Sequence, residues 1–218
     1  MNGWDSSRPV FETDVRGTHI YTAWEGHRRF GYDLMRYLKP GKMVELGTYY
    51  GTSHFAFCQA VKDHGLDTEC YAVDTWEGDK HSGTYEESFF ESVKSCSETF
   101  YPGISHLLRM TFDEALNEFP DQSIDLLHID GLHTYEAVKH DFESWLPKLA
   151  VNGIVLLHDV TVIKDDFGVY RLWAELRQLY PAVQFDHCFG LGIVAPKGYS
   201  TATASMLAQW GTIKPLYP

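Results

Sequence analysis

Two patterns of apolar residues alternate along the chain. Short, nearly continuous apolar runs predict strands that are covered on both faces, and these runs occupy 43–47, 69–73, 104–108, 124–129 and 153–157. Between them, apolar residues spaced three and four apart predict helices at 21–39, 52–64, 89–100, 112–118, 135–149 and 169–180. Strands that alternate with helices in this way form a parallel sheet with right-handed crossovers.

The end of the chain departs from this alternation. Val183–His187 and Leu191–Ala195 predict two strands joined by a tight turn at Gly190, and so short a connection requires an antiparallel pair. The prediction is an α/β fold: a Rossmann-like, doubly wound, mostly parallel sheet of seven strands with an antiparallel last strand. We expect residues 1–218 to form one domain, with a lead-in and helix at 1–40, a candidate lid at 75–88 and a tail at 197–218.

Composition narrows the range of partners. The chain has 18 Lys and Arg against 30 Asp and Glu, a formal net charge of −12, which makes it a poor binder of nucleic acid or anionic membranes. No apolar run approaches the roughly 18 residues of a membrane span, and the polar N-terminus lacks a signal-peptide pattern. The four cysteines form no C-x-x-C pair, so we expect free thiols in a reducing cytoplasm. The apolar stretch Met206–Tyr217 offers a contact surface for a homodimer.

A glycine turn follows the first predicted strand. Gly47 and Gly51 are four residues apart, so the turn does not match the G-x-G-x-x-G dinucleotide pattern. The carboxylate of Glu45 would repel a pyrophosphate but suits a cationic amino group. Ser53 and the first amides of the following helix suit a carboxylate. The turn therefore fits an amino acid head group, although an ordinary strand-to-helix turn is the alternative.

Acidic residues end three further strands, where ligands bind in folds of this kind. Asp74 ends the second strand and is well placed for the two hydroxyls of a ribose, or else it caps a loop. Asp130 and Asp159 end two later strands, and His133 follows Asp130 by three residues. If these strands are neighbours, the two carboxylates stand roughly 5 Å apart at their Cα atoms and require a cation or a shared proton. Hard oxygen ligands favour Mg²⁺, Mn²⁺ or Ca²⁺.

Most of the remaining polar residues near these strands have structural interpretations. We expect His128 to be a core histidine with a satisfied hydrogen bond, whereas His158 alternates with Asp159 and is ambiguous, because it can face the opposite side of the sheet. The pair Asp165–Asp166 is expected to cap the helix that begins near Val169. Five further histidines show no metal-ligand spacing: His54, His64, His81, His106 and His140.

Taken together, these strand-end residues resemble those of class I S-adenosylmethionine-dependent methyltransferases. Within that class the chain is most similar to the family that includes macrolide-sugar O-methyltransferases and cephalosporin-hydroxylase-like proteins. The similarity is carried by the glycine turn, by Asp74, by the run from Ile129 to Val138 and by Leu157–Asp159. The turn also resembles that of catechol O-methyltransferase.

The resemblance implies roles for individual residues. Asp74 would hold the ribose of S-adenosylmethionine, Phe112 or Asp113 would lie by its adenine, and the methionine side would contact Glu45, Gly47, Tyr49, Gly51, Ser53 and Asp130. Asp130 and Asp159 match metal-ligand positions, with Mg²⁺ as the expected ion. Val160 follows them where metal-dependent relatives often carry another ligand.

The resemblance also implies a reaction. A hydroxyl group of a small molecule, such as a sugar or natural product, would be methylated, with Asp130 and His133 in the catalytic site and His133 as the general base. The alternatives are a nicotinamide-dependent oxidoreductase and a non-catalytic binding domain with the same fold.

Overall fold

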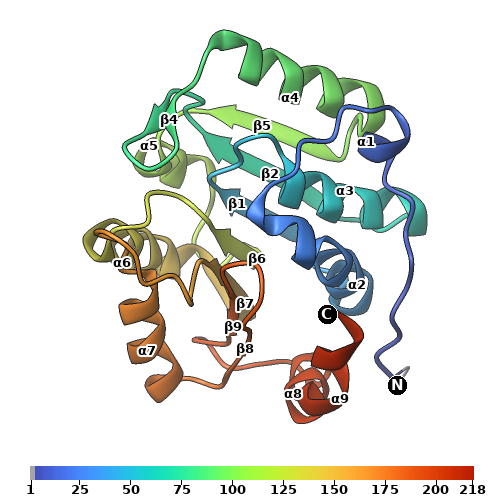
Figure 1. Ribbon diagram of the computed structural model, residues 1–218. Coiled ribbons are helices and arrows are strands. Elements are labelled where there is room, and N and C mark those ends of the chain that lie inside the picture. The colour runs from blue at the N-terminus through green and yellow to red at the C-terminus, as the bar shows by residue number, and fades with distance from the viewer. Residues whose placement is uncertain (1–2) are drawn as a thin grey trace.

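Seven strands form one sheet in the computed structural model, which describes residues 3–218 (Figure 1). The sheet order is β5-β2-β1-β6-β7-β9-β8. The strands are β1 (Lys42–Leu46), β2 (Glu69–Asp74), β5 (Ser105–Arg109), β6 (Ile124–Ile129), β7 (Leu149–His158), β8 (Ala182–Phe185) and β9 (Leu191–Val194). Strands β5, β2, β1, β6 and β7 are parallel, and β9 is antiparallel to both of its neighbours. The predicted mostly parallel sheet with an antiparallel last strand is confirmed.

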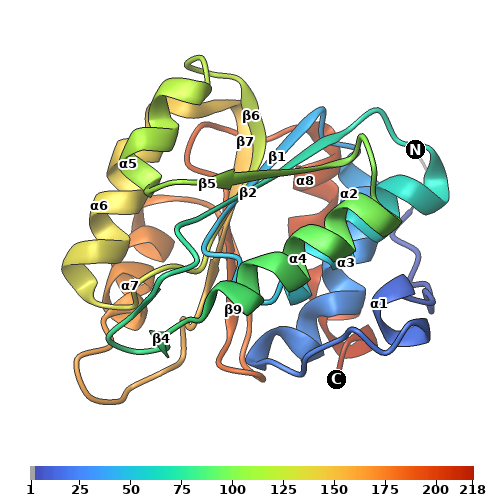
Figure 2. The same cartoon turned by 90° about the horizontal axis from the view of Figure 1, so that it is seen from above.

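Helices cover both faces of this sheet (Figure 2). One face carries α2 (Arg28–Leu38), α3 (Thr52–His64) and α4 (Glu87–Phe100), together with the C-terminal helices α8 (Thr201–Ala208) and α9 (Trp210–Ile213). The other face carries α5 (Phe112–Ala115), α6 (Tyr135–Trp145) and α7 (Val169–Leu179). Each face therefore buries its own apolar core, which explains why β1 and β6 are apolar on both sides.

Local sequence shortens two of the predicted helices. Residues 21–39 do not form one helix, because the Thr22 side chain accepts a hydrogen bond from the Trp24 amide and begins a 3₁₀ turn, η1 (Ala23–His27), before α2. Residues 135–149 divide in the same way: α6 ends at Trp145 and the 3₁₀ turn η3 (Leu146–Lys148) contains a proline. Strand β7 then begins at Leu149, four residues before its predicted start.

Three shorter segments complete the chain. The lead-in contains one helical turn, α1 (Glu12–Val15), and the candidate lid contains a two-stranded ribbon, β3 (Gly78–Asp79) and β4 (Gly83–Thr84). The 3₁₀ turns η2 (Leu116–Glu118) and η4 (Lys214–Leu216) follow α5 and α9.

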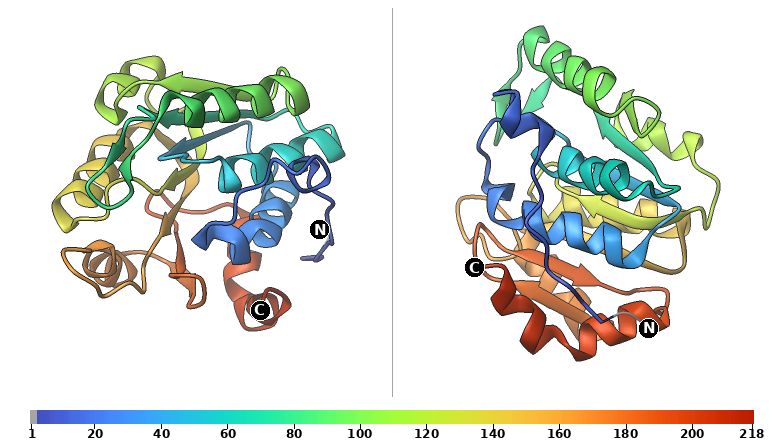
Figure 3. Two further views of the ribbon diagram at one scale, coloured as in Figure 1. Left: turned by 45° about the horizontal axis from the view of Figure 1, so that its top comes forward. Right: turned by 90° about the vertical axis from the view of Figure 1, so that its right-hand side faces the viewer.

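The C-terminal helices, in red, pack against α2, and side chains near both ends of the chain meet there (Figure 3). The Trp4 indole N–H donates to the Tyr217 hydroxyl at 2.9 Å, and that hydroxyl donates to Asp33 at 2.6 Å. Met206 and Ile213 of the tail are buried in the core beneath α2. Part of the apolar tail thus packs within its own chain, Leu216 stays exposed, and the homodimer remains a prediction.

Two further sequence predictions can be compared directly with the structure. All four cysteines are free thiols, as expected, with three of them buried and Cys188 exposed. Among residues 3–218, no helix combines the length and the apolar character that a membrane span requires.

The strand order reverses between β1 and β6. From β1 the chain moves outward through β2 to β5, and then returns to place β6 on the other side of β1. Ligands of doubly wound sheets bind beyond the carboxyl ends of the strands at such a reversal. We therefore expect the ligand-binding residues to follow β1, β2, β6 and β7.

Candidate active site

A cavity of about 640 Å³ opens at this edge of the sheet. Its walls come from the glycine turn after β1, from Asp74 at the end of β2, from residues 130–133 after β6 and from His158 and Asp159 at the end of β7. Residues 22–24 of the N-terminal segment and several residues of the candidate lid complete the lining. The structure thus brings together strand-end residues that are up to 112 positions apart, from Gly47 to Asp159.

The glycine turn is held in place by Asp74. One oxygen of this carboxylate accepts hydrogen bonds from the Thr48 and Tyr49 amides, at 2.8 and 3.1 Å, and the other accepts from the Trp76 amide at 2.8 Å. Gly47 has φ 88°, and a Cβ there would lie 2.2 Å from the Asp130 carbonyl oxygen, so only glycine fits. Asp74 therefore shapes the turn and still borders the cavity.

Glu45 lies beneath the cavity floor instead of in the lining. Its carboxylate is fully buried and accepts a hydrogen bond from His128 Nδ1 at 2.8 Å. The Trp24 indole N–H donates to the other ring nitrogen of His128 at 3.1 Å, which fixes the tautomer. Burial raises the pKa of Glu45, and the hydrogen bond with His128 offsets this only in part. His128 is the core histidine that was predicted, and Ser53 lines the cavity.

Two carboxylates and two imidazoles form a compact cluster at the ends of β6 and β7. His133 Nε2 lies 2.8 Å from Asp159 Oδ2 and 3.6 Å from Asp130 Oδ1. His158 Nδ1 lies 3.3 Å from the Asp130 oxygen and 3.4 Å from the Asp159 oxygen. The other oxygen of Asp159 is buried and has no hydrogen-bond partner among the residues that the structure describes. Each histidine therefore bridges the same two carboxylates.

The charges of this cluster shift the pKa values of all four groups. Against the opposing effect of burial, the two carboxylates raise the pKa of His133 and of His158 to about 10. The histidines in turn hold the pKa values of Asp130 and Asp159 below their usual range, although burial acts in the opposite direction. Without a further cation, the cluster is a double ion pair at neutral pH.

His158 faces the cluster because of a backbone carbonyl behind it. Its Nε2 donates to the Cys188 carbonyl at 3.0 Å, which directs Nδ1 toward the carboxylates. The alternative that His158 points to the opposite face is wrong. Register explains the arrangement: β6 and β7 pair Ile129 with Leu157, so His158 lies opposite Asp130. Asp159 comes one residue later, with φ 62°, a left-handed conformation that returns its side chain to the site.

The structure also adds residues that sequence reasoning missed. His81 of the candidate lid has its Nδ1 3.3 Å from His133 Nδ1, and its other nitrogen lies 2.6 Å from Asp166 Oδ1. Asp166 does not cap α7, because the N-cap is Gly168, which makes no side-chain cap. No spacing in the sequence signals these contacts, since His81 and His133 are 52 positions apart.

Of the remaining predicted cofactor contacts, Phe112 and Tyr49 belong to the lining of the cavity, whereas Asp113 and Gly51 do not. Phe112 lines the cavity, but the neighbouring Asp113 faces solvent and pairs with His140 at 2.8 Å. Gly51 caps α3 with φ 80°, where a Cβ would contact Phe55, so its role in the structure is to shape the backbone. Tyr49 lines the cavity and is 37% exposed.

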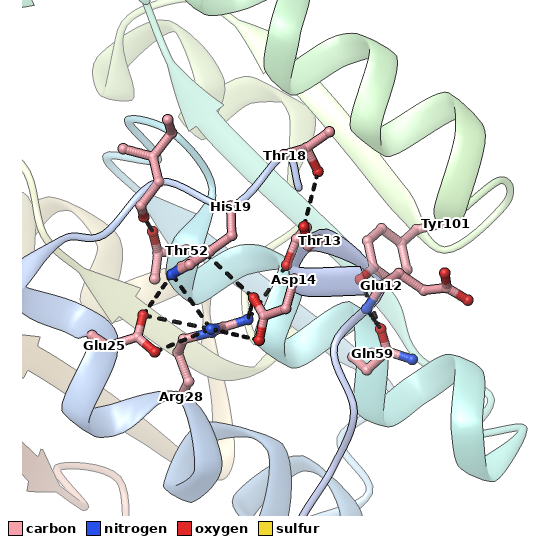
Figure 4. Close-up of polar contacts among 11 residues, drawn as sticks. Glu12, Thr13, Asp14, Thr18, His19, Glu25, Arg28, Thr52, Gln59 and Tyr101 are labelled. Atoms are coloured by element: carbon pink, nitrogen blue, oxygen red, sulfur yellow. Dashed lines mark hydrogen bonds and ion pairs between the residues drawn. The ribbon is translucent and has the colours of Figure 1, made fainter. Parts of the chain in front are cut away.

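A buried arginine ties the N-terminal segment to the cavity wall (Figure 4). Arg28 donates to Asp14 at 2.8 Å and to Glu25 at 3.1 Å. The hydroxyl of Thr52, which lines the cavity, donates to a backbone carbonyl of the same segment at 3.2 Å. These contacts hold residues 22–24 as one wall of the cavity.

The family is established by sequence comparison. A family model described as a methyltransferase domain matches residues 44–160, more than half of the chain. The chain therefore belongs to this methyltransferase domain family. The matched region contains the glycine turn, Asp74, Asp130, His133 and Asp159. This membership favours the methyltransferase prediction over the oxidoreductase and binding-domain alternatives.

A curated relative is similar in sequence over most of this chain. The uncharacterized protein y4gI of Sinorhizobium fredii (strain NBRC 101917 / NGR234) is 48% identical over 174 residues, which are 80% of this chain and 19% of that protein. The chain thus spans about a fifth of the length of this curated relative.

Two solved structures share the architecture. A methyltransferase from Geobacter sulfurreducens has a TM-score of 0.60 with 13% identity, and the match covers 85% of each chain. The O-methyltransferase TomG from Streptomyces achromogenes, solved in complex with SAM, has a TM-score of 0.60 with 16% identity and covers 88% of this chain and 92% of that one.

Proposed function

We propose that this chain is an S-adenosylmethionine-dependent O-methyltransferase of the cytoplasm that acts on a hydroxyl group of a small, uncharged molecule such as a sugar or natural product, assisted by a divalent cation. One observation carries the proposal. In a chain of the methyltransferase family, the glycine turn, Asp74 and the Asp130–His133–Asp159 cluster converge on one cavity.

The cavity offers complementary groups to each part of the cofactor. Asp74 faces the ribose position, Phe112 offers a flat apolar face to the adenine, and Ser53 with the turn amides suits the methionine end. The structural neighbour TomG was solved in complex with SAM, which supports S-adenosylmethionine as the cofactor. When bound, S-adenosylmethionine would supply a methyl group on a positively charged sulfur, for transfer to an acceptor oxygen.

The Asp130–His133–Asp159 cluster fits a divalent cation. One ligand atom from each of the three residues lies within 4.8 Å of the others, and among residues 3–218 the buried Oδ1 of Asp159 has no hydrogen-bond partner. Carboxylate oxygens suit Mg²⁺ or Mn²⁺. Val160 is buried in the core and offers no ligand, so Asp130 and Asp159 would hold the ion, with His133 beside them as the base. When bound, such a cation would lower the pKa of an acceptor hydroxyl and offset the carboxylate charges.

His133 is the proposed general base. It lines the cavity with one nitrogen facing the carboxylates, at the position where an acceptor hydroxyl would approach them. With its pKa near 10, it holds a proton while Asp130 and Asp159 are uncompensated. A residue in that state cannot accept another proton. A cation held by Asp130 and Asp159 would lower the His133 pKa and so allow His133 to act as the base, which links the two parts of the proposal.

The lining also favours an uncharged acceptor. Within residues 3–218, no Lys or Arg lines the cavity, whereas the carboxylates of Asp74, Asp79, Asp130 and Asp159 do. The two histidines of the cluster are already paired with Asp130 and Asp159, so an anionic acceptor would meet no uncompensated cationic side chain in the lining. Flat aromatic faces suited to a sugar or aromatic ring come from Tyr49, Tyr85, Phe112, Phe167 and Phe189.

The cofactor assignment is tested by Asp74→Ala. We expect S-adenosylhomocysteine to bind the unaltered protein in the micromolar range, and the variant to bind about 10- to 100-fold more weakly, as the loss of hydrogen bonds to a charged group predicts. Isothermal titration calorimetry measures both. Asp113→Ala is the matched control, because its carboxylate faces solvent outside the lining. Absence of any binding heat with the folded, unaltered protein would remove the assignment.

The cation is tested with Mn²⁺ as the probe. At a concentration 100-fold above its Kd, we expect Mn²⁺ to add about 2.7 kcal/mol to the free energy of unfolding. Asp159→Asn should abolish this gain, and Asp113→Asn should retain it; thermal unfolding and Mn²⁺ electron paramagnetic resonance measure the effect. The same stabilisation in Asp159→Asn would contradict the site, as would methyl transfer that persists after exhaustive chelation.

A further inference from the structure

The candidate lid reaches across the cavity to the loop that follows β7. Gly78, Asp79, His81, Ser82 and Tyr85 all line the cavity, and Phe167 of the opposite loop lines it too. The tip of the lid is a tight turn. One oxygen of Asp79 accepts from the His81 and Ser82 amides, at 2.6 and 2.8 Å. This turn presents Lys80 and His81 toward the loop after β7.

Asp166 receives both side chains of this tip. One of its oxygens lies 2.6 Å from His81 Nε2, and the other forms an ion pair with Lys80. The His81 side chain is only 10% exposed, whereas that of Lys80 is 52% exposed. Exposed ion pairs contribute little, so the His81 contact is the stronger of the two.

The His81 ring, which Asp166 holds, completes an aromatic stack on His133. The Phe167 ring is parallel to His133, with centroids 4.7 Å apart and planes within 3°. His81 stacks on the same Phe167 ring at 4.5 Å and lies 5.4 Å from the centroid of His133. Its Nδ1 forms a hydrogen bond with Nδ1 of His133 at 3.3 Å. His133 is therefore fixed on one side by its carboxylates and on the other by His81 and Phe167.

We propose that Asp166 is a positioning residue, which anchors the lid tip to the loop after β7 and thereby holds the His81 ring against His133. Asp166 touches no lining carboxylate and acts only through His81 and Lys80. The anchor does not depend on the proposed methyl transfer, because all of its contacts are present without a ligand. If the chain is a methyltransferase, the anchor sets which nitrogen of His133 faces the acceptor.

The adjacent residue provides a matched control. Asp165 carries the same charge, but its carboxylate pairs with Lys164 at 3.7 Å, with both side chains more than 70% exposed. Asp165→Ala thus removes one negative charge from the same loop without removing the anchor. Lys80→Met removes the exposed ion pair and keeps the His81 contact.

Two measurements on the protein without added ligand test the anchor. Hydrogen–deuterium exchange mass spectrometry should show residues 77–86 exchanging on the order of tenfold faster in Asp166→Ala, the factor expected for loss of a charge-assisted hydrogen bond. Asp165→Ala should match the unaltered protein, and Lys80→Met should show a smaller increase. Long-range ¹H–¹⁵N spectra of the histidine rings should show the His133 Nδ1 signal shifting in Asp166→Ala only.

The same measurements can also overturn the proposal. Exchange in Asp166→Ala within twofold of the unaltered protein, or an equal acceleration in Asp165→Ala, would refute the anchor. An unchanged His133 signal in Asp166→Ala would show that the lid does not position that ring. Loss of S-adenosylhomocysteine binding bears on the proposed function alone, so the two failures remain distinguishable.

Discussion

His133→Ala is expected to lower turnover by about 10²- to 10⁴-fold, the usual contribution of a general base. The variant should keep nearly the same affinity for S-adenosylhomocysteine, because His133 faces the carboxylate cluster instead of the glycine turn. Turnover is measured as S-adenosylhomocysteine release with any hydroxylated acceptor on which the unaltered enzyme is active. Cofactor affinity and melting temperature are measured on the same protein preparation.

The structure also defines the alternative outcome. If His133 only supports the start of α6, its loss should cost about 1 kcal/mol of stability and little rate. Near-normal turnover with a lowered melting temperature would therefore place the base elsewhere. His158 would be the next candidate, because it contacts the same carboxylates. Asp130→Ala, in contrast, should impair turnover and cofactor binding together, because Asp130 borders both parts of the cavity.

His128→Leu is expected to destabilise the fold by about 3–5 kcal/mol at pH 8. The substitution leaves the Glu45 carboxylate fully buried without its hydrogen-bond donor, and it also removes the acceptor of the Trp24 indole N–H. Urea unfolding of the variant and the unaltered protein measures the difference in free energy.

This loss should depend on pH in a definite direction. Burial already raises the pKa of Glu45 above 4.5, and removal of His128 raises it further. A carboxyl group whose pKa is higher in the folded state stabilises the fold below its unfolded pKa, and this contribution is lost as pH rises through the folded value. The deficit of His128→Leu should therefore be smallest near pH 5 and largest near pH 8.

The double variant Glu45→Met/His128→Leu is the control for this prediction. Replacing both partners of a buried hydrogen bond with apolar residues of similar volume is often nearly neutral for stability. The double variant should therefore recover the part of the loss that comes from the buried Glu45 carboxylate and show little of the pH dependence, although Trp24 still lacks its acceptor. A deficit in His128→Leu that does not vary with pH, or no recovery in the double variant, would contradict the buried-charge explanation.

Elements with strong local signals were predictable from the chain alone. Helix α3 begins and ends as predicted, because Gly51 and Gly65 adopt left-handed conformations at its two ends. Strand β6 also has its predicted bounds, because nearly all of its side chains are buried. Where a local cap competed with periodicity, the prediction failed: Thr22 divides the helix expected over 21–39.

Sequence reasoning also found which residues stand at the strand ends, because parallel strands place their carboxyl ends at the same edge of a sheet. It did not show which way those side chains point. Glu45 was expected in the cofactor pocket, but the alternation of side chains along β1 buries it beside His128. His158 enters the site because β6 and β7 pair in one particular register.

The contacts of the lid were visible only in the tertiary structure. His81 meets His133 across 52 positions, and Asp166 meets His81 across 85. The spacing of apolar residues shows which face of a helix or strand is buried. It does not show which loops approach each other at the edge of the sheet. The element order and the strand-end chemistry were local properties of this chain. The pairing of histidines and carboxylates depended on strand register, on a left-handed Asp159 and on two loops meeting over the cavity.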